Sequence, residues 1–141
     1  SPGLQKRQLA KYKHSGNWKA FADAIDKIME ADLLAVRTAD FILCFHNPEV
    51  YSVGTTVELY EAYRLKKPIY LVSNAPRSEI HGWILKFVSY VVYPSFAQVL
   101  EQIKKDMRQW KKVHVAKKRL DSALKSCYTI FIKHTGGEPC E

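Results

Sequence analysis

The stretch Ala39-Asp40-Phe41-Ile42-Leu43-Cys44-Phe45 decides the fold of this 141-residue chain. It is short, it is continuously apolar after Asp40, and His46-Asn47-Pro48 closes it. Unbroken apolar character over so few residues is typical of a strand that is buried on both faces of a parallel sheet. We therefore predict a buried strand over residues 39–45.

Before this strand, residues 18–36 carry apolar side chains at spacings of three and four, which place them on one face of a helix. The apolar positions are Phe21, Ala24, Ile25, Ile28, Met29 and Leu33. Asn17 stands immediately before them, and asparagine is a residue type that caps helix N-termini. We predict an amphipathic helix that begins after Asn17 and leads into the strand.

After the strand, helical and strand patterns alternate. The expected order is a helix over 53–67, a strand over 68–73, a short helix over 78–87, a strand over 90–93 and a helix over 96–110. Such an order predicts an α/β fold, a flavodoxin-like (doubly wound) parallel sheet with helices on both faces. In folds of this class, ligands bind at the carboxyl ends of the strands.

The chain length fits one domain with a hydrophobic core of its own. We expect the α/β domain over residues 1–112 and a C-terminal extension over 113–141. A basic helix at 113–126 and a strand at 128–132 would make up this extension. The strand has the length to fill a vacant position in the sheet.

The composition excludes several classes of protein. Hydrophobic residues make up 47% and charged residues 26%, the balance of a globular chain rather than a disordered or membrane one. No apolar run approaches the roughly 18 residues that span a bilayer, and the basic start does not resemble a signal peptide. We expect a cytoplasmic protein with no membrane partner. Three cysteines without a CxxC pair suggest neither a disulfide framework nor a zinc site, and no metal or organic cofactor is expected.

The net charge of +8 is unevenly distributed. Five basic residues precede the first acid, Asp23, and the segment 104–125 carries nine more against two aspartates. Such clusters attract phosphate groups. They leave open whether the phosphate belongs to a nucleotide, to a nucleic acid, or to nothing that the protein binds.

The loop after the predicted strand enters a helix through Ser52-Val53-Gly54-Thr55-Thr56-Val57-Glu58. Glu58 would lie in the first turns of that helix, where the helix dipole favours an ionised carboxylate. Gly54 permits close approach of a ligand, and the Ser52 and Thr55 hydroxyls lie beside helix N–H groups that suit a phosphate. Alternatively, Ser52 is simply the N-cap of the helix.

These residues, together with Asp32-Leu33, Ala39-Asp40-Phe41-Ile42 and Lys66-Lys67-Pro68-Ile69, resemble the nucleoside 2-deoxyribosyltransferase family from Asp32 to about Leu100. The resemblance implies that Glu58 is the nucleophile that attacks the anomeric carbon of a sugar. It also implies that Asp32 contacts the sugar or assists the leaving base. The covalent intermediate would then pass to water or to a second base, as in a retaining glycosidase.

One departure from the family indicates the substrate. The transferases carry an aspartate six residues before the nucleophile, whereas this chain has Ser52, as in the 2'-deoxynucleoside 5'-phosphate N-hydrolase branch. That similarity implies a nucleoside 5'-monophosphate substrate and a homodimer, with Ser78 and His81 reaching toward the neighbouring site. Family members also open with a strand that this sequence lacks, so Ser1–Leu4 would be a remnant of the loop that follows it.

Other interpretations remain open. In one of them, Glu58 is an ordinary surface residue on a helix. In that case the chain would be a non-catalytic module that binds a nucleotide or a nucleic acid through the same crevice and its basic C-terminal helices. A relative acting on a ribonucleotide or dinucleotide glycosidic bond is a third possibility. Trp83 is expected to be a core or interface aromatic.

Overall fold

The computed structural model describes residues 2–106 and 128–132, which fall into two compact units, Ser1–Leu34 and Ala35–Glu141. The helices are α1 (Pro2–Ser15), α2 (Trp18–Thr38), α3 (Val53–Arg64), α4 (Gly82–Phe87) and α5 (Phe96–Asp106). The strands are β1 (Phe41–Phe45), β2 (Ile69–Val72), β3 (Val92–Tyr93) and β4 (Tyr128–Ile132). The helix expected at 113–126 and the domain boundary expected at residue 112 lie outside the described residues.

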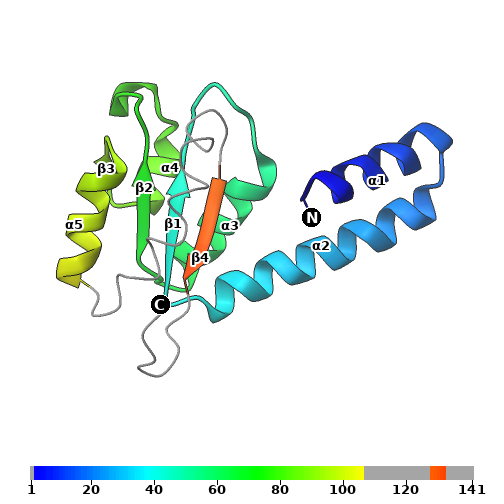
Figure 1. The fold of residues 1–141 in the computed structure, drawn as a ribbon, viewed down its shortest axis with the longest axis horizontal. Helices are drawn as coiled ribbons and strands as arrows, with labels where there is room; N and C mark the ends of the chain where they lie inside the picture. Colours follow the sequence, from blue (N-terminus) through cyan, green and yellow to red (C-terminus); the bar gives the residue numbers. More distant parts are fainter. Residues whose placement is uncertain (1, 107–127, 133–141) are drawn as a thin grey trace. The chain divides into compact units, whose positions relative to one another are not determined.

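The strands form one sheet in the order β3-β2-β1-β4 (Figure 1). β1, β2 and β3 are parallel, with Leu43 opposite Tyr70 in the first pair. β4 runs antiparallel along the other edge of β1, where Leu43 faces Ile130. The prediction that residues 128–132 fill a vacant position in the sheet is therefore confirmed.

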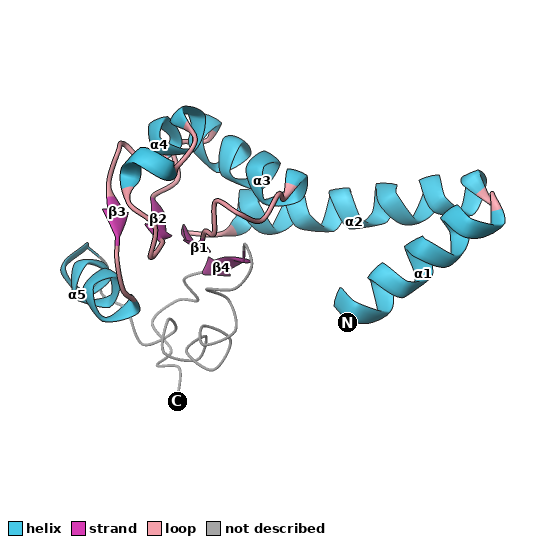
Figure 2. Ribbon diagram, turned by 90° about the horizontal axis from the view of Figure 1, so that it is seen from above, coloured by secondary structure: helices cyan, strands magenta, loops and turns pink. Residues whose placement is uncertain are grey.

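Helices cover both faces of this sheet, as predicted (Figure 2). On one face, Val99, Leu100 and Ile103 of α5 pack with alternate residues of β1 and β2. On the other face, Leu59 and Ala62 of α3 and Ile84 of α4 pack against the remaining strand residues, together with the end of α2. All five residues of β1 are buried. The fold is a small α/β sheet of the flavodoxin-like kind, with an antiparallel edge strand.

The ends of α2 are both fixed by side chains. The Ala20 N–H donates to Oδ1 of Asn17 at 3.2 Å, which confirms the predicted N-cap. At the other end, Nζ of Lys67 donates to the carbonyl oxygens of Arg37 at 2.7 Å and Ala39 at 2.6 Å. These bonds satisfy carbonyls at the end of the helix and fix the point where the chain enters β1.

The first segment of the chain differs from the prediction. Pro2–Ser15 is a helix, so the interpretation of Ser1–Leu4 as the remnant of a loop was wrong. Proline suits the first turn of a helix, because the N–H group that it lacks has no partner there. Gly16, with a φ of 71°, ends α1 in the left-handed conformation that glycine adopts without strain.

The segment before β3 also differs from the prediction. A single short helix over 78–87 was expected, but the structure has a 3-10 turn at Arg77–Glu79 followed by α4. His81 separates them, because its Nδ1 accepts the Trp83 N–H at 3.2 Å and caps α4. The interruption makes His81 the N-cap of α4 and places Trp83 in the first turn of that helix.

Lys66 gives a prediction about stability. It follows α3 with a φ of 58°, and the Lys67 N–H bonds the Ala62 carbonyl at 2.9 Å, the bond pattern in which glycine usually follows a helix. A side chain in this conformation is strained, so Lys66→Gly should raise the free energy of unfolding by about 0.5–1 kcal/mol. Urea denaturation measures the change. Lys66→Ala, which removes the same charge and keeps the strain, should give no gain, and an equal gain would show that charge is the cause.

Candidate functional site

A cavity of about 630 Å³ opens at the carboxyl end of β1. One wall is the loop after β1 with the start of α3, and the other is the segment from Ser78 to Ile84. The lining residues are His46, Pro48, Glu49, Val50, Tyr51, Ser52, Thr55, Thr56, Ser78, Glu79, Ile80, His81, Trp83 and Ile84. The cavity lies where an α/β sheet is expected to bind a ligand, and its volume suits a molecule of nucleotide size.

The cavity brings together four of the residues that the sequence singles out for substrate binding. Ser52 and Thr55 come from the α3 side, and Ser78 and His81 come from the opposite wall. Gly54 is exposed and is not among the lining residues, and a side chain added there would meet nothing within 4 Å. The space around Gly54 therefore does not require glycine.

Ser52 is the N-cap of α3. Its Oγ accepts the Thr55 N–H at 3.2 Å and donates to the Thr55 Oγ1 at 2.9 Å. The Ser52 carbonyl accepts from the Thr56 N–H and hydroxyl at 3.2 and 2.9 Å. The hydroxyl must therefore turn away from Thr55 before it can donate to a phosphate, because one O–H group cannot point in both directions.

Glu58 lies one turn after Thr55 on α3 and is half-buried. Residues three apart share a helix face, so Glu58 follows the cavity-lining Thr55 along the same side of α3. Glu58 itself is not among the lining residues.

Glu61, the other acid on α3, has a different environment. Its oxygens pair with Arg64 Nη2 at 2.9 Å and Arg37 Nε at 3.5 Å. The hydrogen bond from Arg64 lowers the pKa of Glu61 most, and the nearby Arg37 charge lowers it further. Because two guanidinium groups compensate its charge, Glu61 is a structural ion-pair residue.

Asp32 is half-buried on α2, and burial raises the pKa of its carboxyl above the usual value. A raised pKa suits a group that holds and delivers a proton. Asp32 belongs to the compact unit Ser1–Leu34, whereas Glu58 belongs to Ala35–Glu141. Their joint action on one substrate therefore stays a prediction from the resemblance.

His46 is a cavity residue that the sequence did not single out for a function. It follows β1 directly, is half-buried, and its backbone N–H donates to the Val72 carbonyl at 2.8 Å. Burial lowers the pKa of its imidazole, which favours the neutral form of the ring. Its position after a central parallel strand was the signal available in the sequence.

Trp83 is not a core residue. It was expected in the core or in an interface, and 69% of its surface is exposed where it lines the cavity, so the core alternative was wrong and the interface alternative stays a prediction. Tyr51, on the other wall, is 91% exposed. Sequence alone does not distinguish such a tryptophan from a core residue, because tryptophan occurs at both kinds of position.

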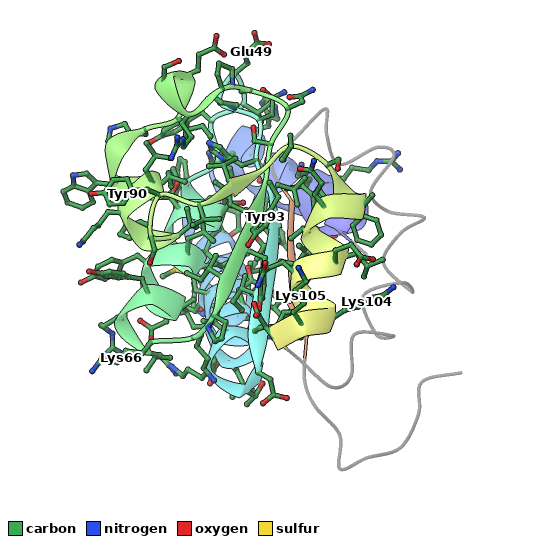
Figure 3. All side chains as sticks on the ribbon, turned by 90° about the vertical axis from the view of Figure 1, so that its left-hand side faces the viewer. Glu49, Lys66, Tyr90, Tyr93, Lys104 and Lys105 are labelled. Atoms are coloured by element: carbon green, nitrogen blue, oxygen red, sulfur yellow. The ribbon has the colours of Figure 1, made fainter. Side chains whose placement is uncertain are left out.

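The described charges of the cavity lining are acidic. Glu49 and Glu79 lie on opposite walls, and the described lining includes no lysine or arginine. Figure 3 shows Glu49 and Lys66 at opposite ends of the unit Ala35–Glu141, with Lys104 and Lys105 on α5. Within the described lining, the α3 N-terminus is therefore the group that would attract an anionic ligand.

Two further properties concern the part of the chain that the structure describes. Its histidines, cysteines and acids form no group of three or more that could hold a metal ion. None of its helices has both the length and the apolar character needed to cross a bilayer.

Comparisons with protein-family models, curated proteins and solved structures find no match for this chain.

Proposed function

We propose that the chain cleaves or transfers the N-glycosidic bond of a (deoxy)nucleoside 5'-monophosphate, with the Glu58 carboxylate as nucleophile. The observation that carries this proposal is the arrangement along α3. Ser52 and Thr55 line a cavity of about 630 Å³ at the helix start, and Glu58 follows Thr55 by one turn. A sugar placed beside Glu58 would have its base or its phosphate in the cavity.

The chemistry is that of a retaining glycosidase. The Glu58 carboxylate attacks the anomeric carbon, the bond to the base nitrogen breaks, and a sugar ester of Glu58 forms. The departing base takes up a proton, a step that the resemblance implies Asp32 assists. Water or a second base then attacks the same carbon, which releases Glu58 as a carboxylate.

The charges around the cavity act on the 5'-phosphate in opposite directions. Backbone N–H groups and the dipole at the start of α3 attract an anion. The carboxylates of Glu49 and Glu79 repel one, and both line the same cavity. The preference for nucleotide over nucleoside therefore measures which of these influences is larger.

Incubation of the chain with a panel of deoxynucleoside 5'-monophosphates and the matching nucleosides tests the function. Chromatography of the released base gives the rate for each compound. We expect release from the monophosphates. Faster release from the nucleosides would assign the substrate to the uncharged class, and a folded chain that leaves the whole panel intact would contradict the proposal.

We further propose that the protein works as a homodimer through an aromatic face on α3 and α4. This face comprises Val57, Tyr60, Tyr63 and Phe87, with Phe87 in ring contact with Tyr60 at 5.8 Å and Tyr63 at 5.3 Å. Such a patch can pair with its own copy across a two-fold axis. Sedimentation should give twice the chain mass, and Tyr60→Glu should give a monomer. A wild-type monomer at micromolar concentration would contradict the dimer.

The second candidate function is a non-catalytic module that binds a nucleotide or a nucleic acid. One observation favours it, because Glu58 is not among the residues that line the cavity. A module of this kind needs the shape of the site but not a nucleophile. Full biological activity of a Glu58→Gln variant would support the module, because the amide keeps the shape and cannot attack a sugar.

A further inference from the structure

Two large aromatic side chains stand at the cavity with most of their surface uncovered. Tyr51 is 91% exposed and Trp83 is 69% exposed. Both line the cavity, Tyr51 from the loop after β1 and Trp83 from the first turn of α4. Exposed aromatic surface loses the free energy that burial would give it, so two such rings at one cavity indicate a planar apolar ligand.

The Trp83 ring packs against Phe87. The centroids of the two rings lie 6.5 Å apart and their planes make an angle of 77°. Its backbone N–H donates to Nδ1 of His81 at 3.2 Å, which fixes the first turn of α4. The ring is thus supported on one side while most of its surface stays open, which lowers the entropic cost of binding a ligand there.

Polar groups for the edge of such a ligand lie in the same lining. His46 contributes an imidazole, whose ring nitrogens are hydrogen-bonding groups. Ser78 contributes a hydroxyl, and Glu79 contributes carboxylate acceptors. Flat rings beside a few hydrogen-bonding groups are what a nucleobase requires, because a base combines a π-face with a polar edge.

We propose that Tyr51 and Trp83 form the base-binding subsite, in which the nucleobase of the substrate stacks on their rings. This inference rests on the proposed function and adds to it the position of the base. The base would occupy the cavity, and the sugar would extend along α3 toward Glu58. Stacking accepts any base, so the subsite supplies affinity for the base without strong selection among bases.

Isothermal titration of the full chain carrying Glu58→Gln, which should bind the nucleotide without releasing its base, tests this subsite with two probes, deoxyadenosine 5'-monophosphate and 2-deoxyribose 5-phosphate. The second probe is the first without its base. Tyr51→Ala and Trp83→Ala should each weaken binding of the nucleotide by about 10-fold or more. Binding of the sugar phosphate should stay unchanged. Tyr51→Phe and Trp83→Phe keep a ring and should retain nucleotide affinity within about 3-fold.

Several results would overturn the subsite. Equal nucleotide affinity in the Glu58→Gln chain and both of its alanine variants is one, and an equal loss for both probes is another. Failure of the Glu58→Gln chain to bind millimolar nucleotide is a third. Because both side chains are largely exposed, the variants should keep the wild-type melting temperature, which checks their folding.

The subsite and the proposed function can fail separately. Base release with a KM that the alanine variants leave unchanged would exclude the subsite and keep Glu58 as nucleophile. Nucleotide binding that depends on both rings, in a chain that releases no base, would exclude the enzyme and keep the subsite. Glu58→Gln should bind the nucleotide as the wild type does.

Discussion

Glu58→Gln is expected to lower the rate of base release by about 10³-fold or more, because an amide cannot form the sugar ester. The fold should be unaffected, since the change replaces one oxygen of a half-buried side chain with a nitrogen of similar size. Single-turnover kinetics with a deoxynucleoside 5'-monophosphate measures the loss. KM should change little, because the substrate is bound mainly by other residues.

Glu101→Gln is the matched control for this change. Glu101 lies on α5, is 66% exposed in its side chain, and pairs with Lys104 at 3.4 Å on the surface. It carries the same charge as Glu58 and lies on a helix that contributes nothing to the cavity lining. Its amide variant should therefore turn over at the wild-type rate. An equal loss in both variants would indicate an effect of net charge and not of nucleophilicity.

Phe45→Ala should lower the free energy of unfolding by about 3–5 kcal/mol, the largest stability effect that we predict. Phe45 ends β1, is 1% exposed, and packs with residues of β2 and α5 in one cluster. Its removal would leave a cavity in the layer between the sheet and α5, which a close-packed interior cannot fully refill. Urea denaturation followed by far-UV circular dichroism gives the value.

Two variants show whether burial is the cause. Phe45→Leu keeps most of the apolar volume and should cost about 1 kcal/mol. Val53→Ala, on a residue that is 57% exposed and lies outside the aromatic face, should cost less than about 0.5 kcal/mol. A loss below about 1 kcal/mol for Phe45→Ala would mean that β1 is not buried between two helical layers.

The elements that the sequence predicts well are those in which buried apolar residues follow a regular spacing along the chain. Phe41–Phe45 is apolar without interruption because helices cover both faces of the sheet at β1. The α2 helix shows apolar residues at helical spacing because one of its faces is sheltered. The caps at Asn17 and Ser52 follow from residue type alone, since both place a side-chain acceptor before a helical pattern.

The elements that the sequence did not predict lack a regular spacing of apolar residues. The α1 helix has no continuous apolar face, and only Leu9 and Tyr12 among its described side chains are even partly buried. Its lysines, arginine, glutamines and alanine favour helix by propensity, a weaker signal than periodicity. The break between the 3-10 turn and α4 depends on a histidine cap, which the apolar pattern of 78–87 does not reveal.

The candidate site could be predicted on one wall only. The α3 side follows from the rule that ligands bind after parallel strands, and Ser52 and Thr55 were identified on that basis. On the opposite wall, Ser78 and His81 came from the resemblance, whereas Glu79 and Trp83 depend on how the loop after β2 folds back. The relation between Asp32 and Glu58 spans two compact units and cannot be derived from spacing along the chain.

Mass mapping of the enzyme during turnover tests the nucleophile most directly. The chain is mixed with a deoxynucleoside 5'-monophosphate, quenched in acid and digested, and the peptide that contains Glu58 is examined. We expect that peptide to carry the mass of the deoxyribose phosphate ester, and we expect no such mass in the Glu58→Gln chain. Base release at the wild-type rate from Glu58→Gln, or a sugar attached to another residue, would contradict Glu58 as the nucleophile.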